Sequence, residues 1–252
     1  MLSKNNIKFI NSLSLKKNRD SNHLFVAEGE KLVDELLAHI PCEMLIATDE
    51  YVAHQSVNVQ NLITVPNQEE LKKISFLKTP SPVIGVFQQR QNVFNVEILT
   101  NELVLALDDI QDPGNLGTIT RIADWFGIQH IICSPHTVDI YNFKAIQATM
   151  GAISRVQVYY TDLVPLLINC QKKNVPIYGT FLQGDNIYST QLTSNGLIIM
   201  GNEGQGISHH LQSFIARKLF IPNYPSNAKT SDSLNVAIAT AITCSEFRRR
   251  LL

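Results

Sequence analysis

The chain has 252 residues, of which 44% are hydrophobic and 17% are charged, a composition typical of a globular protein with a substantial core. The formal net charge is -1, whereas proteins that bind nucleic acid over most of their surface are strongly basic. Any nucleic-acid-binding surface of this chain must therefore be a local patch. The start of the chain lacks an apolar signal-peptide core, and no run of about 18 apolar residues predicts a membrane span, so we expect a cytoplasmic protein without membrane contacts.

The first part of the chain mixes amphipathic helix with short strands. Residues 24–26 could form a strand, residues 28–40 carry leucines near helical spacing, and residues 83–87 predict another strand. The polar stretch 88–97 interrupts this pattern and is the best candidate for a linker. We therefore predict a first, smaller domain over residues 1–95.

Residues 96–252, the second predicted domain, alternate apolar strands with helical stretches. This alternation predicts an α/β fold with a largely parallel sheet. One helix between the strands carries Ile119, Ile122, Ala123 and Phe126 at helical spacing and is expected to bury that face. Ligands bind beyond the carboxyl ends of parallel strands, so functional residues are expected directly after them. The predicted strands are 103–107, 130–133, 156–159, 176–181, 197–200 and 218–221.

The first segment that suggests chemistry runs from residue 107 to residue 127. It turns through Asp112 and Asn115 into the predicted helix, and Arg121 lies off the buried face. A cation near a helix N-terminus interacts unfavourably with the helix dipole, which costs roughly 0.3 to 1 kcal/mol. An arginine at this place therefore hints at an anion that binds there. The alternative is an exposed arginine paired with Asp124 or Asp112, and the residues alone leave both interpretations open.

The second segment, residues 197–208, is an apolar strand followed by a loop that contains Gly201, Gly204 and Gly206. The glycine spacing fits neither a dinucleotide-binding turn nor a phosphate-binding loop. Glu203 also disfavours phosphate and favours a cationic or hydrogen-donating ligand. A purely structural glycine turn is the alternative.

The third segment, residues 221–250, contains a strand end, a loop broken by prolines and a helix. Asp232 can cap this helix, which would place Ser233 and Asn235 in the first turn. Polar side chains and free amides at a helix start can hold a ligand, although ordinary capping is the alternative. The apolar residues at four-residue spacing in this helix are Leu234, Ile238 and Ile242.

Together and in this order, the three segments resemble the motifs of the SpoU family of RNA methyltransferases, within the SPOUT superfamily. Residues 25–37 and 81–87 also look like the N-terminal substrate-binding domain of that family. The loop between Ile221 and Ser233 is several residues longer than the family pattern, which puts cofactor contacts there in question. The matching motifs are N-x-G-x-x-x-R at Asn115, Gly117 and Arg121, G-N-E-G-x-G at 201–206 and S-L-N-V at 233–236.

The resemblance implies an S-adenosylmethionine-dependent RNA 2′-O-ribose methyltransferase that works as a homodimer. It implies a C-terminal α/β domain with a mostly parallel sheet and a deep trefoil knot, together with a smaller N-terminal α/β domain that binds RNA. Large-subunit ribosomal RNA is the expected substrate, and transfer RNA is the alternative. No metal is expected.

The resemblance also implies roles for individual residues, and it brings Arg121 of one subunit toward the cofactor of the other. Because arginine stays protonated near neutral pH, we assign Arg121 to an RNA phosphate and leave the general base open. The expected catalytic residues are Arg121, Asn115, Glu203, Ser233 and Asn235. The expected cofactor-binding residues are Gly201, Asn202, Glu203, Ile221, Ser233 and Leu234.

Two other classes of function stay open at this point. One is a non-catalytic RNA-binding or ribosome-assembly protein, and the other is a nucleotide-dependent α/β enzyme, which the missing phosphate loop disfavours. The widely spaced cysteines predict reduced thiols without a chemical role. Local RNA contacts, or simply solvated helix faces, are expected at Lys4, Lys8, Lys16, Lys17, Arg19, Arg248, Arg249 and Arg250.

Overall fold

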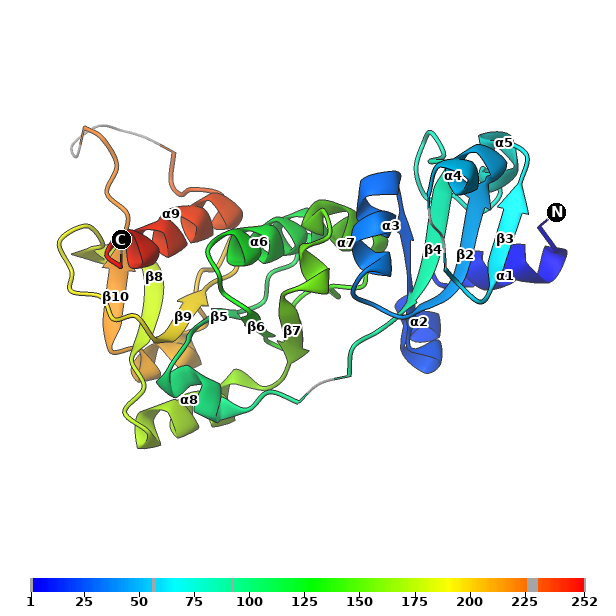
Figure 1. The fold of residues 1–252 in the computed structure, drawn as a ribbon. Helices are drawn as coiled ribbons and strands as arrows, with labels where there is room; N and C mark the ends of the chain where they lie inside the picture. The colour runs from blue at the N-terminus through cyan, green and yellow to red at the C-terminus, as the bar shows by residue number, and fades with distance from the viewer. Residues whose placement is uncertain (1, 56–57, 92, 226–230, 252) are drawn as a thin grey trace. The chain divides into compact units, whose positions relative to one another are not determined.

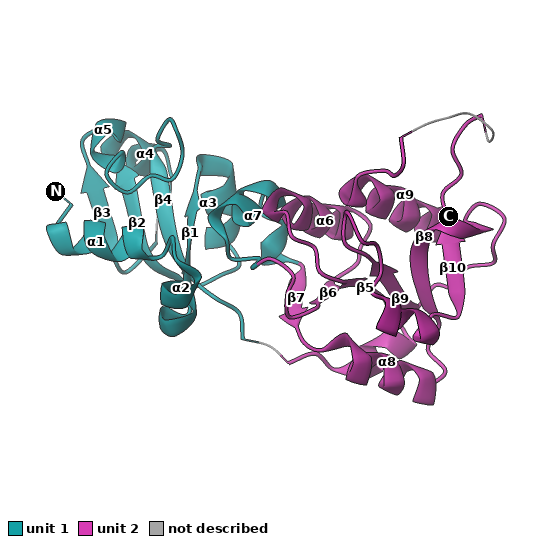
Figure 2. Ribbon diagram, turned by 180° about the vertical axis from the view of Figure 1, so that it is seen from behind, with its two compact units in different colours: residues 1–91, 139–155 teal, residues 92–138, 156–252 magenta. Residues whose placement is uncertain are grey.

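The computed structural model describes residues 2–55, 58–91, 93–225 and 231–251. The chain divides into two compact units, of which the first comprises residues 1–91 and 139–155 and the second comprises the remainder (Figure 2). Each unit has one sheet of its own. Among the described residues, no helix is both long and apolar enough to cross a membrane.

The first unit is built on a four-stranded sheet in the order β1-β4-β2-β3, where β4 runs antiparallel to its two neighbours. Ile10 of α1, Leu13 directly after α1 and Leu71 of α5 pack into the core of this unit and are fully or almost fully buried. The strands are β1 Leu24–Glu28, β2 Cys42–Thr48, β3 Leu62–Val65 and β4 Val83–Gln88. The helices are α1 Lys4–Ser12, α2 Lys16–Asn22, α3 Glu30–Leu37, α4 Asp49–His54, α5 Gln68–Leu71, α7 Phe143–Thr149 and the short η2 Ala152–Ser154.

Residues 139–155 are fastened to the first unit by buried polar contacts. The Arg19 guanidinium lies 2.6 Å from the Asp139 carboxylate and also donates to two backbone carbonyls, while Gln147 donates to the backbone oxygen of Glu28 at 2.7 Å. Because its side chain is only 4% exposed, Arg19 cannot contribute to the basic surface expected near the chain start. The four lysines expected there are exposed.

The second unit is built on a six-stranded parallel sheet in the order β10-β8-β9-β5-β6-β7. The predicted α/β fold and parallel sheet are confirmed, and each predicted strand coincides with an observed one to within a few residues at the ends. Figure 1 shows α6 and α9 along one face of this sheet and α8 along the other. The strands are β5 Leu103–Leu107, β6 His130–Cys133, β7 Gln157–Tyr160, β8 Ile177–Asn186, β9 Gly196–Met200 and β10 Arg217–Phe220. The helices are η1 Val96–Thr100, α6 Pro113–Trp125, α8 Leu163–Lys172, η3 His209–Phe214 and α9 Val236–Arg249.

Helices α6 and α9 are parallel neighbours that are tied at both ends. At their N-terminal ends Asn235 bonds to Asn115 at 3.0 Å, and at their C-terminal ends the Arg248 guanidinium donates to the Phe126 carbonyl at 2.8 Å. The predicted helix face of α6 is buried at Ile119 and Ala123 and half-buried at its other two positions. This pairing therefore brings the starts of both helices to the carboxyl end of the sheet.

The buried face of α9 differs from the prediction. Leu234 and Ile238 are 47% and 52% exposed, because α9 begins only at Val236 and turns a different set of residues inward. The arginines at the end of α9 are also engaged: Arg249 and Arg250 bond to the buried Glu246 carboxylate, and Arg250 binds three backbone carbonyls. The buried residues of α9 are Val236, Ala237, Thr240, Thr243, Cys244, Glu246 and Phe247.

Candidate active site

The three sequence motifs meet at the carboxyl end of the parallel sheet. Strand β5 leads into the turn that starts α6, and its neighbour β9, paired with it through Leu107 and Met200, leads into the glycine-rich loop. The segment after β10 returns at the same edge to start α9. These are the positions where ligands bind in open parallel sheets.

Asn115 joins the three motifs through its side-chain amide. Its nitrogen Nδ2 donates to Glu203 Oε1 at 2.9 Å, and its oxygen Oδ1 accepts from Asn235 Nδ2 at 3.0 Å. A carboxylate only accepts hydrogen bonds, so Glu203 fixes the orientation of the Asn115 amide. Three residues predicted as catalytic are thus brought into contact.

Asn235 is oriented in the same way from its other side. Its Oδ1 accepts from the backbone amides of Ala237 and Ile238 at 2.9 and 3.3 Å, so it is the N-cap of α9. The predicted cap, Asp232, and the predicted place of Ser233 and Asn235 in the first turn are therefore wrong. The amides at the start of α9, Asn235, Asn115 and Glu203 form one directed chain of hydrogen bonds, which holds the Glu203 carboxylate in place.

The loop after β9 is closed on itself by Asn202. Its backbone exchanges two hydrogen bonds with Gly206 at 2.9 and 3.0 Å, and its side-chain oxygen accepts from the amides of Gly204 and Gln205. A Cβ atom at Gly201 would overlap the backbone of Gly206, which explains the glycine. Asn202 therefore shapes the predicted cofactor-binding loop with its own side chain.

The turn after β5 clamps this loop at two points. The Asp108 carboxylate, which is 4% exposed, accepts from the Ser208 amide at 2.7 Å. The Asp109 carbonyl accepts from Asn202 Nδ2 at 2.7 Å, and the Asp109 amide donates to Ser134 Oγ. The sequence analysis missed these residues, although their position directly after a strand was a usable signal. The loop is thus held in shape by the chain itself.

Arg121 lies apart from this cluster. It is the ninth of thirteen residues of α6, so the argument from a cation near the helix N-terminus is wrong. Its exposed position off the buried face is confirmed. Within the described part of the chain, no hydrogen bond or ion pair of its guanidinium occurs, and the Asp112 carboxylate instead accepts from the Asn115 amide at 2.8 Å. Arg121 is available to an external anion.

The remaining predicted cofactor-binding residues border the cluster. Ile221 is half-buried at the end of β10, and Ser233 and Leu234 are exposed immediately before Asn235. In the long loop between them, Tyr224 and Pro225 are exposed, whereas Ser226, Asn227 and Lys229 lie outside the described residues.

The site has the chemistry of a binding site for an organic cation with hydrogen-bond donors. It offers the exposed Glu203 carboxylate beside a loop whose shape the chain's own hydrogen bonds hold. No group of three or more His, Cys, Asp or Glu side chains that could hold a metal occurs among the described residues. Burial raises the pKa of Cys42 and Cys170 to about 11 and of Cys244 to about 12, which keeps these thiols protonated.

Comparison with known proteins gives matches over most of the chain. Residues 102–245 match the model of the SpoU rRNA methylase family, and residues 4–85 match an MRM3-like substrate-binding domain. The chain is 30% identical, over 91% of its length and 90% of the relative, to the 23S rRNA (guanosine(2553)-2′-O)-methyltransferase RlmP of Bacillus subtilis.

Two solved structures are similar over nearly their whole length. A putative RNA methyltransferase of the TrmH family from Porphyromonas gingivalis has a TM-score of 0.89 and 39% identity, and the match covers 99% of both chains. An rRNA methyltransferase from Sinorhizobium meliloti with bound AdoMet has a TM-score of 0.85 and 32% identity, and the match covers 100% of this chain and 98% of the other.

Proposed function

Because this chain belongs to the SpoU rRNA methylase family, we propose that it uses S-adenosylmethionine to methylate a ribose 2′-hydroxyl of large-subunit ribosomal RNA. The family match spans the unit that carries the candidate site, and the B. subtilis relative is named for this reaction on 23S rRNA. The AdoMet-bound neighbour supports the cofactor. The match of residues 4–85 to a substrate-binding domain supports an RNA partner for the first unit.

The observation that carries this proposal is the contact of Asn115 with both Glu203 and Asn235. The three residues come from motifs far apart in the sequence, and two hydrogen bonds of 2.9 and 3.0 Å join them at one sheet edge. A nucleotide-dependent enzyme would need donors that face phosphate at this edge, whereas the chain presents a carboxylate there.

When bound, S-adenosylmethionine supplies a sulfonium methyl group for in-line transfer to a ribose 2′-oxygen. The residues of the chain then have to align the two reactants, because holding them in line lowers the barrier to transfer. We assign Glu203 to ligand donors through its second carboxylate oxygen, with Asn115 and Asn235 as its supports. Arg121 is assigned to an RNA phosphate. Backbone groups at Gly201, Ile221, Ser233 and Leu234 are assigned to the cofactor, with Asn202 shaping the loop.

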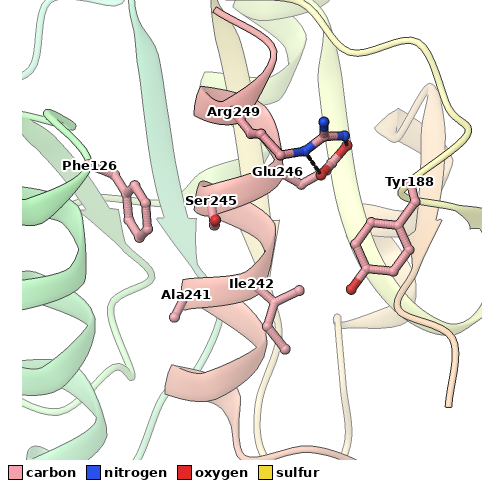
Figure 3. A pocket seen from close by; sticks show the side chains of 7 residues that line it. All are labelled: Phe126, Tyr188, Ala241, Ile242, Ser245, Glu246 and Arg249. Atoms are coloured by element: carbon pink, nitrogen blue, oxygen red, sulfur yellow. Dashed lines mark hydrogen bonds and ion pairs between the residues drawn. The ribbon is translucent and has the colours of Figure 1, made fainter. Parts of the chain in front are cut away.

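We further propose that the second unit forms a two-fold homodimer through the outer face of α9. Ile238 and Ile242 lie one turn apart on that face, and the exposed Leu234 lies two residues before the helix; we call these three residues the apolar stripe. An open groove of about 740 Å³ continues the stripe toward the end of α9 (Figure 3). A second copy would cover both on each subunit. The groove is lined by Phe126, Tyr188, Ala241, Ile242, Ser245, Glu246 and Arg249.

Ribose methylation mapped across total RNA from a deletion strain and its parent tests the reaction and the substrate together. We expect one site in large-subunit ribosomal RNA to lose its methyl group and to regain it when the wild-type gene is restored. A lost site in transfer RNA would move the substrate to that class. An unchanged map, together with no heat of S-adenosylmethionine binding in calorimetry, would instead favour a non-catalytic RNA-binding protein.

A further inference from the structure

Helix α1 of the first unit carries two lysines whose charge the chain does not offset. Lys4 is the first residue of this helix and Lys8 lies one turn later, and both are exposed. Within the described residues neither ammonium group has a hydrogen bond or an ion pair, and the sequence has no acidic residue before Asp20. A cation at the start of a helix opposes the helix dipole, and like charges four residues apart repel. An external anion would relieve both conflicts.

The fold holds these two lysines on a fixed helix. Ile10 is fully buried in the core of the unit, and Ser3 caps the helix by accepting from the Asn6 amide at 3.1 Å. Asn11, one turn after the second lysine, donates through Nδ2 to the backbone oxygen of Lys73 at 3.0 Å. Residues four and then three positions apart lie on one face of a helix, so both lysines share the outer face with Asn11. A ligand on this face meets a helix that is already formed, which keeps the entropic cost of binding low.

We propose that the outer face of α1 binds the sugar-phosphate backbone of the RNA substrate, with Lys4 and Lys8 on two phosphate groups. Lysine binds phosphate as a point charge, and phosphate contacts position a nucleic acid without reading its bases. The ammonium of Lys16, by contrast, is neutralised by Asp20 at 2.7 Å. The inference rests on the proposed function, because RNA is the assumed substrate, and it adds the surface of the first unit that holds the RNA.

The composition of this face favours a phosphate backbone over a protein partner. Protein interfaces are depleted of lysine and depend on aromatic and apolar anchors, which the exposed side of α1 lacks. A two-fold contact with a second copy would set the same lysines against each other, because such an interface pairs a patch with itself. An RNA strand supplies the anions and needs no apolar anchor. The exposed residues of α1 are Lys4, Asn5, Lys8 and Asn11.

The salt dependence of RNA binding tests the two phosphate contacts in the full-length protein. The probe is large-subunit ribosomal RNA from a deletion strain, and filter retention measures its affinity over a range of salt concentrations. Losing two phosphate contacts in Lys4→Gln/Lys8→Gln should reduce the slope of log affinity against log salt by about 1.4 to 1.8. The affinity at about 0.1 M salt should fall at least about tenfold. Lys4→Arg/Lys8→Arg keeps both cations and should stay within about threefold of the wild type.

A second double variant controls for net charge. Lys172 and Lys173 lie at the end of α8 in the second unit, and both are exposed. Lys172→Gln/Lys173→Gln removes the same total charge as the α1 variant and should leave the slope and the affinity at their wild-type values. Equal losses in the two double variants would overturn the proposal, because the effect would then come from the charge of the whole protein.

Lys4→Glu should change stability and RNA binding in opposite directions. A carboxylate at the first residue of α1 interacts favourably with the helix dipole and with Lys8 one turn later, so the Tm should rise by about 1 to 3 °C. The same carboxylate repels a phosphate, so the RNA affinity should fall at least about tenfold. A purely structural lysine would lose both properties together. A fall of both the Tm and the RNA affinity would therefore overturn the proposal.

The outcomes distinguish this inference from the proposed function. If Lys4→Gln/Lys8→Gln binds RNA like the wild type, the inference is wrong. It is also wrong if this variant dissociates in sedimentation without losing RNA affinity, because a second copy would then cover α1. Calorimetry with S-adenosylmethionine and methyl transfer by the wild-type protein test the function separately. When both succeed and the α1 variant keeps its RNA affinity, only the role of α1 falls. When both fail, the proposed function falls, whatever the salt dependence shows.

Discussion

The side-chain amide of Asn115 donates a hydrogen bond of 2.9 Å to the Glu203 carboxylate, across 88 positions of sequence. Asn115→Asp replaces this donor with a second carboxylate while keeping the acceptor for Asn235. Like charges in contact repel, so we expect methyl transfer to fall by about 10² or more, with weaker cofactor binding. Methyl transfer and calorimetry on the same preparation check this. Wild-type activity in Asn115→Asp would show that the contact has no role.

Asn235 offers a matched pair of variants because it caps α9 and also holds Asn115. Asn235→Asp keeps the cap but loses the donor, whereas Asn235→Ala loses both. We expect both variants to lose turnover, and only the alanine variant to lose about 1 kcal/mol of unfolding free energy. Urea unfolding and methyl transfer measure the two effects separately. Equal stability of the two variants would contradict Asn235 as the cap.

Gly201 and Gly204 lie three residues apart in the loop after β9 and should respond differently to alanine. A Cβ at Gly201 would overlap the backbone of Gly206 and Ile207, whereas at Gly204 the nearest atom is Asn202 Oδ1 at 3.6 Å. We expect Gly201→Ala to destabilise the protein by about 1 to 3 kcal/mol and to lose S-adenosylmethionine binding. Gly204→Ala should retain both properties. Thermal shifts with and without cofactor test the pair.

Arg121→Ala should separate binding from chemistry. The exposed side chain has no partner among the described residues, so its removal should change the unfolding free energy by less than about 0.5 kcal/mol. Cofactor affinity should stay near that of the wild type, while methyl transfer falls by about 10² or more. Calorimetry measures the cofactor affinity, and turnover on an RNA validated by methylation mapping measures the methyl transfer. Normal turnover would remove Arg121 from the mechanism.

The buried His130 should lower the free energy of unfolding in acid. Its imidazole is 7% exposed, and burial lowers its pKa, although Glu102 at 3.6 Å opposes the shift. The unfolded state then takes up a proton near pH 6.5 while the folded state stays neutral, so acid favours unfolding. The loss begins near that pH and is complete below the folded pKa. Urea unfolding at about pH 7.5 and 5.5 should show a smaller pH dependence for His130→Gln than for the wild type.

The sequence by itself determined the parallel sheet and the identity of the three motifs. Alternation of apolar strands and helices needs no distant information, because each strand between helices is buried on both faces and its apolar run is visible locally. Strands β5 and β6 were accordingly predicted with their observed ends. The resemblance of the ordered motifs named the family that the comparisons confirm.

Only the tertiary structure decided how the site residues support one another. Asn235 rather than Asp232 caps α9, because the capping residue must also reach Asn115 on a neighbouring helix, and this contact has no local sequence signal. The exposure of Leu234 and Ile238 follows from where α9 begins against α6. Residues 139–155 cluster with the first unit through the buried Arg19 and Asp139 pair. Each of these features depends on pairs of side chains more than a hundred residues apart, which periodicity within one element cannot reveal.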